Sequence, residues 1–230
     1  MLWLATLGGV FELDLREDIF SGKTQFRNYT HHDGLSSNFI YKTFVCSTNR
    51  TWFGTDGKGL SVLDNGKITN YIQANEISLK TVYTITEDHR GSIWFGTAEH
   101  GIFEFDGKNF HQLHVKGGNP DLEVTSLVTD DLGNIIIVHP SRISILNPET
   151  KHLTYYDDEV GLKDLEPVLN SFAPVGDGSI WLGGNDKLVR YTALNEQLEI
   201  HPRNIIEGIN VFFEPIDYQS VSEFSHTENS

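Results

Sequence analysis

The sequence predicts an all-β protein, a β-propeller of four-stranded antiparallel blades. Two observations predict this fold: a segment of about 42 residues recurs along the chain, and each copy alternates apolar and polar residues with a period of two. The composition agrees, because 21 Gly, 14 Phe, 8 Tyr and 4 Trp among 230 residues favour short strands joined by tight turns. Helical periodicity is absent over any useful length of the sequence.

The recurring segment is clearest around two tryptophans. Residues 91–97 read Gly-Ser-Ile-Trp-Phe-Gly-Thr, and residues 178–184 read Gly-Ser-Ile-Trp-Leu-Gly-Gly. Shorter copies lie at 50–55 and 2–6, and a weaker copy at 133–138 has isoleucine at the tryptophan position. A large apolar side chain that recurs once per unit is expected to pack as a wedge between neighbouring blades. These predicted anchors are Trp3, Trp52, Trp94, Ile136 and Trp181.

The unit at 81–115 contains four alternating strands. Its last two strands are joined by Asp106-Gly107, and Asn65-Gly66 marks the same hairpin one unit earlier. Four-stranded antiparallel units repeated around an axis are propeller blades. The repeat predicts about five of them, at 2–30 (three strands only), 38–73, 80–115, 123–156 and 168–201.

Residues 202–230 follow the repeats as a tail or as the truncated start of another domain. The incomplete first blade leaves two arrangements open. An open arc would expose strand edges and invite self-association, whereas a small ring would close if 205–213 supplied the missing strand. The open or self-associated form is the one we expect.

Charge and cysteine content exclude several classes of partner and site. The net charge of −15 argues against nucleic acid and anionic membrane surfaces as partners. No run approaches the roughly 18 apolar residues needed to span a bilayer, and the apolar start at 1–6 lacks the positive leader of a signal peptide. The single Cys46 excludes an intramolecular disulfide and a multi-cysteine zinc site, and its alternating neighbours predict a small core residue.

Ligand contacts are predicted on one face of the propeller. If the strands of a blade are labelled A to D from the axis outward, the B–C and D–A loops emerge on the same side, which we call the upper face. Polar groups from different blades converge there on a rigid scaffold. Their hydrogen-bonding chemistry suits a small-molecule or oligosaccharide ligand. The predicted ligand-binding residues are His31, His32, Lys58, Glu99, His100, His139, Asn185 and Lys187.

Many of the polar residues also have a structural interpretation. Lys58 and Lys187 suit solvated loop charges. His31 and His32 are an unpromising metal pair, because adjacent residues of a strand point to opposite faces and no third ligand follows at a standard spacing. No metal and no cofactor are therefore predicted. Turn chemistry explains the aspartates that precede glycine or end an A strand, namely Asp33, Asp56, Asp88, Asp106, Asp130 and Asp177.

Catalytic motifs are scarce, so no enzyme activity is predicted for this chain. It has no Gly-x-Ser-x-Gly elbow, no His-Glu-x-x-His motif and no phosphate-binding glycine loop. A propeller glycosidase or lyase is the first alternative, with Asp56, Glu99 and Asp186 as carboxylates from separate loops. A protein-interaction scaffold is the second alternative, and it would need an apolar upper face, whereas these loops are largely polar.

The repeats also resemble a known family. Ile93-Trp94-Phe95-Gly96-Thr97, the preceding Glu87-Asp88, and the linker from His32 to Asn38 are similar to the two-component regulator propeller repeat. The resemblance covers about residues 1 to 201. Residues 205–218 resemble the first strands of the Y_Y_Y-type β-sandwich that follows those repeats in the family.

The resemblance implies a function. In that family the repeats build the periplasmic sensor of hybrid histidine kinases, many of which detect glycan breakdown products. The chain is then expected to be a ligand-sensing part of a longer protein anchored in the inner membrane, with the kinase outside this sequence. Signalling is expected to proceed by ligand-biased packing across a dimer.

Overall fold

The computed structural model describes residues 1–16, 26–113, 123–140, 142–156, 166–193, 209–211 and 214–216. The chain divides into two units, Met1–Ala193 and Leu194–Ser230. Within the described residues the regular elements are β-strands and one short 3-10 turn, η1 (His31–Asp33). None of the described helical residues forms a helix long and apolar enough to cross a membrane.

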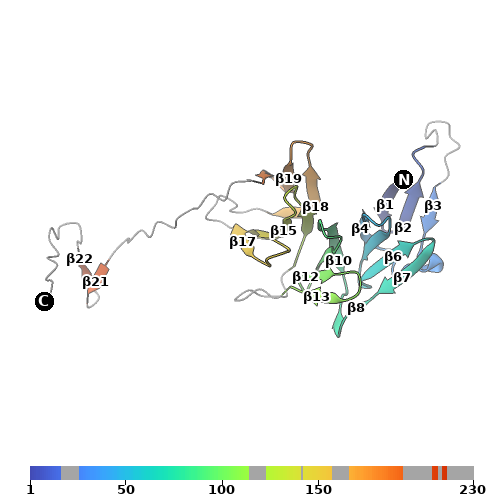
Figure 1. Ribbon diagram of the computed structural model, residues 1–230, viewed down its shortest axis with the longest axis horizontal. Helices are drawn as coiled ribbons and strands as arrows, with labels where there is room; N and C mark the ends of the chain where they lie inside the picture. Colours follow the sequence, from blue (N-terminus) through green and yellow to red (C-terminus); the bar gives the residue numbers. More distant parts are fainter. Residues whose placement is uncertain are drawn as a thin grey trace. The chain divides into compact units, whose positions relative to one another are not determined.

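The first unit consists of antiparallel sheets that follow one another along the chain, coloured from blue to orange in Figure 1. The first blade has three described strands: β1 (Leu2–Thr6), β2 (Gly9–Leu13) and β3 (Arg27–Tyr29). The second has four: β4 (Ile40–Val45), β5 (Thr51–Thr55), β6 (Leu60–Asp64) and β7 (Lys67–Tyr71).

The third and fourth blades are four-stranded as well. The third contains β10 (Val82–Glu87), β11 (Ile93–Thr97), β12 (Ile102–Phe105) and β13 (Phe110–Gln112). The fourth contains β14 (Ser126–Thr129), β15 (Ile135–His139), β16 (Arg142–Leu146) and β17 (Leu153–Tyr156). The fifth has three described strands: β18 (Pro167–Pro174), β19 (Ser179–Gly184) and β20 (Leu188–Thr192).

The predicted fold class is confirmed: the protein is all-β, with four-stranded antiparallel blades, and its described sheets do not close into a ring. A small hairpin, β8 (Gln73–Ala74) and β9 (Ile77–Ser78), lies between the second and third blades. The predicted fourth strand of the last blade lies outside the described residues. Of the predicted second domain, the structure describes only the hairpin of β21 (Ile209–Val211) and β22 (Glu214–Ile216).

The core lies between the blades, where the predicted anchors occupy different environments. Trp52 is fully buried, with its ring 5.5 Å from that of Phe105 in the next blade. Trp94 packs on the inner strand of the fourth blade, and Ile136 packs on the fifth. Trp3 is partly buried, 5.8 Å from the ring of Phe53. Trp181 differs from the expected wedge, because 39% of it is exposed and no described blade covers it.

Aspartates close the turns between the first and second strands of the third and fourth blades. Asp88 is buried and accepts hydrogen bonds from the backbone N–H of Ser92 and from Trp94 Nε1, each at 3.0 Å. Asp130 accepts from the backbone N–H of Asn134 at 2.8 Å. These contacts agree with the turn-capping role predicted for both residues.

Cys46 takes the same position in the second blade. It is buried, as predicted, with 4% of its surface exposed. Its Sγ lies 3.1 Å from Thr48 Oγ1. The indole N–H of Trp52 is buried and donates to no oxygen or nitrogen atom among the described residues, whereas the equivalent Trp94 donates to Asp88. The second blade has Cys46 where the third blade has Asp88. Because a thiol is a weaker hydrogen-bond acceptor than a carboxylate, the turn of the second blade is less well bonded.

Candidate functional site

The inner strands of four blades meet around the side chain of Asn170. Its Nδ2 donates a hydrogen bond to the Tyr83 carbonyl oxygen at 2.7 Å and lies 3.5 Å from the Tyr41 carbonyl oxygen. Its backbone N–H donates to the Thr125 carbonyl oxygen at 3.2 Å. One residue of the fifth blade therefore contacts the second, third and fourth blades, which places it at the axis.

A backbone irregularity produces this convergence. The register with the neighbouring strand shifts between Ile40 and Lys42, and again between Val82 and Thr84, so that Tyr41 and Tyr83 are extra residues in their strands. Such bulges redirect side chains. A longer shift precedes Phe172, and there Asn170 has a φ of 54°, a left-handed conformation that asparagine tolerates well.

Two tyrosines and an unsatisfied amide oxygen occupy this position. The rings of Tyr41 and Tyr83 meet edge to face with centroids 5.1 Å apart. Burial raises the pKa of Tyr83, and the nearby carboxylates of Glu123, Asp56 and Glu99 raise it further. Asn170 Oδ1 is buried and has no hydrogen-bond partner among the described residues. A buried acceptor is normally hydrogen-bonded, so a water molecule or a ligand hydroxyl could donate to this oxygen.

Lys42 places a cation beside the same cluster. Its Nζ lies 4.5 Å from the ring centroid of Phe172, two residues beyond Asn170. Burial lowers the pKa of Lys42, and no carboxylate in the described ranges forms an ion pair with it. The axis thus combines a desolvated ammonium, two aromatic rings and an open acceptor.

The sequence predicted none of Tyr41, Lys42, Tyr83 and Asn170 as site residues. The sequence did contain a signal for three of these residues, because each stands eleven positions before a predicted anchor. The pairs are Tyr41 with Trp52, Tyr83 with Trp94 and Asn170 with Trp181. Thr125 has the same relation to Ile136. Repeat positions share one location in every blade, so these residues had to be neighbours around the axis.

The predicted histidine pair lies in the loop between the first and second blades. His31 and His32 form η1, which Thr30 caps, and their ring centroids are 3.8 Å apart. The expectation that these side chains point to opposite faces is therefore wrong, because they occupy a 3-10 turn and not a strand. No group of three or more histidine, cysteine or acidic side chains in the described ranges is placed to hold a metal ion.

Lys58, Glu99 and His100 lie in the predicted upper-face loops. Lys58 is exposed. Glu99 accepts a hydrogen bond from Lys80 Nζ at 2.5 Å, which lowers the pKa of Glu99. His100 is partly buried, and its carbonyl oxygen accepts from Gln112 Nε2 at 2.9 Å.

His139, Asn185 and Lys187 differ in accessibility. His139 is only 7% exposed, with Nδ1 3.1 Å from the Glu123 carbonyl oxygen, and burial lowers its pKa to about 4. It is therefore neutral at pH 7 and lies inside the blade. Asn185 is exposed and donates from Nδ2 to Glu166 Oε2 at 2.7 Å, and Lys187 is partly buried.

The carboxylates of the enzymatic alternative have structural partners or lie in solvent. Asp56 accepts a hydrogen bond from Thr81 Oγ1 at 2.9 Å, which ties the second blade to the third. Glu99 is held by Lys80, and Asp186 is exposed. Asp56 and Glu99 thus have structural partners in the second and third blades, and their side chains make no mutual contact among the described interactions.

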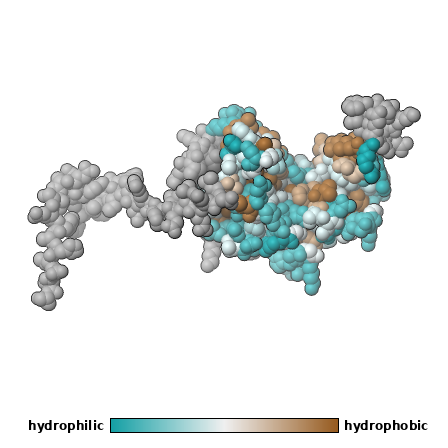
Figure 2. All heavy atoms as spheres, turned by 45° about the horizontal axis from the view of Figure 1, so that its top comes forward, coloured by the Kyte–Doolittle hydropathy of each residue, from teal (hydrophilic) through white to brown (hydrophobic). Residues whose placement is uncertain are grey.

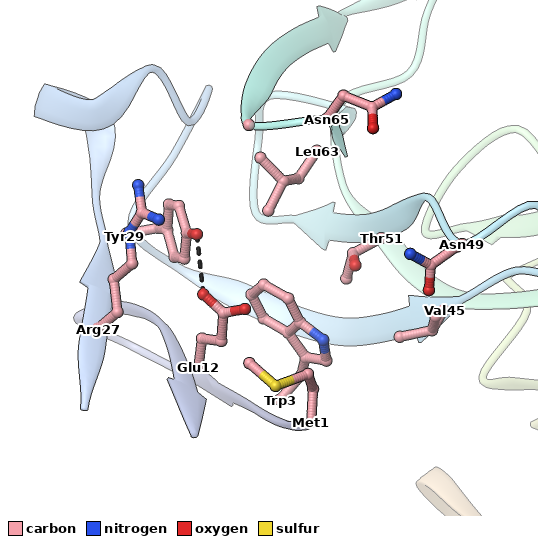
Figure 3. A pocket seen from close by; sticks show the side chains of 11 residues that line it. Met1, Trp3, Glu12, Arg27, Tyr29, Val45, Asn49, Thr51, Leu63 and Asn65 are labelled. Atoms are coloured by element: carbon pink, nitrogen blue, oxygen red, sulfur yellow. Dashed lines mark hydrogen bonds between the residues drawn. The ribbon is translucent and has the colours of Figure 1, made fainter. Parts of the chain in front are cut away.

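A cavity of about 530 Å³ lies between the first two blades (Figure 3). Trp3, Glu12 and Tyr29 of the first blade form one wall, and the Tyr29 hydroxyl donates to Glu12 Oε2 at 2.9 Å. Asn49 and Asn65 stand on the opposite wall. The sequence did not predict this cavity, because its residues come from loops and strands with no shared motif.

Comparison with known proteins identifies the repeat. Residues 76–99 match the two component regulator propeller family. The chain is 27% identical over 183 residues to histidine kinase P4 of Formosa agariphila, a match that covers 73% of this chain and 13% of that protein. The predicted recognition of two-component regulator propeller repeats is thus confirmed, while the resemblance of 205–218 to a Y_Y_Y sandwich stays a prediction.

Solved structures support the fold. The extracellular domain assigned to the hybrid two component system BT3049 of B. thetaiotaomicron aligns with a TM-score of 0.71 and 22% identity, over 83% of this chain and 26% of that one. Virginiamycin B lyase from Staphylococcus aureus aligns with a TM-score of 0.62 and 15% identity, over 83% and 65% of the two chains. The same fold therefore occurs in an extracellular domain assigned to a two component system and in a lyase, and function depends on the site.

Proposed function

We propose that this chain, which carries two component regulator propeller repeats, is the periplasmic ligand-sensing propeller of a hybrid sensor kinase and binds a glycan-derived ligand at its upper face. The observation that supports this most is the axial cluster around Asn170. It combines an unsatisfied acceptor with two tyrosine rings and the Lys42 ammonium. Sugars are recognised by such combinations of hydrogen-bonding groups and aromatic faces.

The upper-face loops are proposed to supply further polar contacts to the ligand. Asp56, Glu99 and Glu123 are close enough to Tyr83 to raise its pKa, so the second-, third- and fourth-blade loops approach the axis together. Lys58, Asn185 and Lys187 belong to the same class of loops in the second and fifth blades. Ligand binding would then bridge blades, and a ligand that prefers one packing of the blades would shift the equilibrium toward it.

The chain is proposed to be a binding module of a membrane-anchored kinase and not an enzyme. The suspected carboxylates Asp56 and Glu99 are engaged by Thr81 and Lys80. The proposed organisation is a series of blades followed by a second domain over 202–230. The blades are proposed at 2–30, 38–73, 80–115, 123–156 and 168–201. The relatives are much longer than this chain, so its place in a kinase is part of the proposal.

A panel of oligosaccharides tests ligand binding. At concentrations well above its dissociation constant, at least one member should raise the melting temperature of the 230-residue chain by several degrees, since a hundredfold excess over Kd contributes about 2.7 kcal/mol. Asn170→Ala should abolish that shift, and Lys108→Ala, in an exposed hairpin on the opposite side of the blade, should preserve it. Silence toward every glycan, with turnover of a chromogenic glycoside, would favour the enzymatic alternative.

Self-association is proposed from the exposed apolar residues of the terminal blades. Leu2 and Leu4 are 38% and 40% exposed in β1, and Leu188 is 73% exposed in β20. Figure 2 shows hydrophobic patches separated by hydrophilic surface over the described residues. Sedimentation velocity should detect a concentration-dependent dimer that Leu188→Lys weakens, whereas a monomer at all concentrations would contradict self-association.

A further inference from the structure

Lys42 is a partly buried cation in the axial cluster. It is the third residue of β4 and follows Tyr41, whose carbonyl oxygen lies 3.5 Å from Asn170 Nδ2. Its Nζ lies 4.5 Å from the ring centroid of Phe172. None of the ion pairs between described residues includes Lys42. Within the described ranges this ammonium therefore has an aromatic neighbour but no ion-pair partner.

The missing partner contrasts with the acidic composition of the chain. The sequence has 32 Asp and Glu against 17 Lys and Arg. Other lysines are either paired with a carboxylate, as Lys80 and Lys151 are, or exposed to solvent, as Lys67 is. Lys42 has neither arrangement, so no opposite charge compensates the desolvation of its ammonium.

The strands around Lys42 belong to four blades of the described chain. β4 packs against β1 of the first blade and β10 of the third, and β18 of the fifth blade supplies Phe172. Burial by these strands lowers the pKa of Lys42, and no charged neighbour contributes to that shift. The carboxylates that raise the pKa of Tyr83 thus do not stabilise the Lys42 ammonium. The fold keeps carboxylates away from this cation.

An acceptor without a donor lies in the same cluster. Asn170 Oδ1 is buried and has no hydrogen-bond partner among the described residues. The two groups are close along both strands, because Asn170 Nδ2 approaches the residue before Lys42, and Phe172 follows Asn170 by two positions. A ligand that satisfies both groups has to carry a hydroxyl donor and a negative charge.

We propose that the axial cluster selects an acidic sugar, with the anionic group of the sugar on Lys42 Nζ and a ring hydroxyl donating to Asn170 Oδ1. The choice of a sugar rests on the proposed function, and the negative charge rests on the environment of Lys42. An ammonium acts as a point charge, so the carboxylate of a uronic acid and a sulfate ester share the chemistry that it recognises.

The net charge of −15 does not oppose this contact strongly. Exposed charges farther away than about 8–10 Å are largely screened at physiological ionic strength, whereas a direct contact with a partly desolvated ammonium is not. The charge-assisted hydrogen bond from Lys42 Nζ would replace water as the partner of the ammonium. Charge selection at the axis is therefore compatible with an acidic surface.

Calorimetric titration of the 230-residue chain with D-glucose, D-glucuronate and D-glucose 6-sulfate tests the charge. The three probes share a ring and differ only at carbon 6. At least one of the two anions should bind about tenfold more tightly than glucose. A preference for glucuronate alone assigns the carboxylate, and a preference for the 6-sulfate alone assigns the sulfate ester. Equal affinity for all three sugars, or no binding of either anion, would overturn the proposal.

Substitutions of lysine locate the charge selection. Lys42→Gln removes the positive charge and should reduce the tenfold preference to about one. Lys42→Arg keeps the charge and should retain a preference, which separates loss of charge from loss of folding. Lys67→Gln removes an exposed lysine from β7 of the same blade, outside the cluster, and is the matched control that should keep the full preference. A tenfold preference that persists in Lys42→Gln would contradict the role of this residue.

The outcomes separate this inference from the proposed function. Binding of a neutral glycan that depends on Asn170, without a preference for the anionic sugars, would overturn the acidic ligand and leave the sensor proposal standing. Acetate carries the negative charge without the ring. If acetate binds as tightly as glucuronate and Lys42→Gln abolishes both, Lys42 is an anion site and the glycan is contradicted. Absence of all binding would overturn both.

Discussion

Replacing Asp88 with alanine is expected to lower the free energy of unfolding by about 3–5 kcal/mol, one of the largest losses available in this chain. Asp88 is 4% exposed and accepts hydrogen bonds from the Ser92 backbone, Trp94 Nε1 and the Arg90 side chain. Alanine would leave the buried indole and backbone donors unsatisfied and would separate Arg90 from its closest carboxylate. Urea denaturation monitored by circular dichroism measures the loss.

Asp106→Ala is the matched control for Asp88→Ala. Asp106 also caps a turn of the third blade, since it accepts hydrogen bonds from the backbone N–H groups of Lys108 and Asn109, but it is exposed. Its loss should cost about 1 kcal/mol or less. Equal destabilisation by the two substitutions would contradict the role assigned to burial.

The Asp88 carboxylate should also make the free energy of unfolding depend on pH in the acidic range. Burial acts to raise the pKa of Asp88, but the hydrogen bonds from Arg90, Trp94 and Ser92 outweigh it and the net pKa is lowered. A lowered pKa in the folded state stabilises above the unfolded value, and that stabilisation is lost as the pH falls through the folded value. Urea midpoints below pH 4 should therefore fall more steeply for the parent chain than for Asp88→Ala.

The blades were predictable because their determinants are local. Alternation, the Asp-Gly and Asn-Gly hairpins and a recurring large side chain each act within one unit, and repetition multiplies the signal. The same logic predicts the turn aspartates, whose partners at Ser92 and Asn134 lie four residues away.

The candidate sites were less predictable because they depend on contacts between blades. Asn170 meets the carbonyl of Tyr83 across 87 positions of sequence, and no local pattern reports that approach. The cavity at Trp3 is lined by residues of two blades that lie far apart in the sequence, from Met1 to Gly66, so no local pattern reports it. His31 and His32 were misjudged for a local reason, since a Thr30 cap and the following Gly34 end cap produce a 3-10 turn where an extended segment was assumed.

Replacing Gly59 with alanine is expected to lower the free energy of unfolding by about 3 kcal/mol or more, which would make it the second large effect. Gly59 has a φ of 69°, where an L side chain is strained. A Cβ there would lie 2.3 Å from the Tyr71 carbonyl oxygen and 3.2 Å from Ile72 Cα, and neither backbone atom can move freely. The Gly59 N–H also donates to the Lys80 carbonyl oxygen at 2.6 Å, so a shift of this loop would separate the second blade from the start of the third.

Gly57→Ala, in the same loop, separates the conformational penalty of a positive φ from the steric clash of an added Cβ. Gly57 has a φ of 73°, close to that of Gly59, but no atom lies within 4 Å of its added Cβ. Its substitution should therefore cost only the conformational penalty, about 1 kcal/mol. The difference between the two variants in urea denaturation measures the steric contribution at Gly59. If both variants lose about 1 kcal/mol, the approach of Tyr71 to Gly59 does not constrain the blade, and the upper-face loop is more adaptable than its contacts indicate.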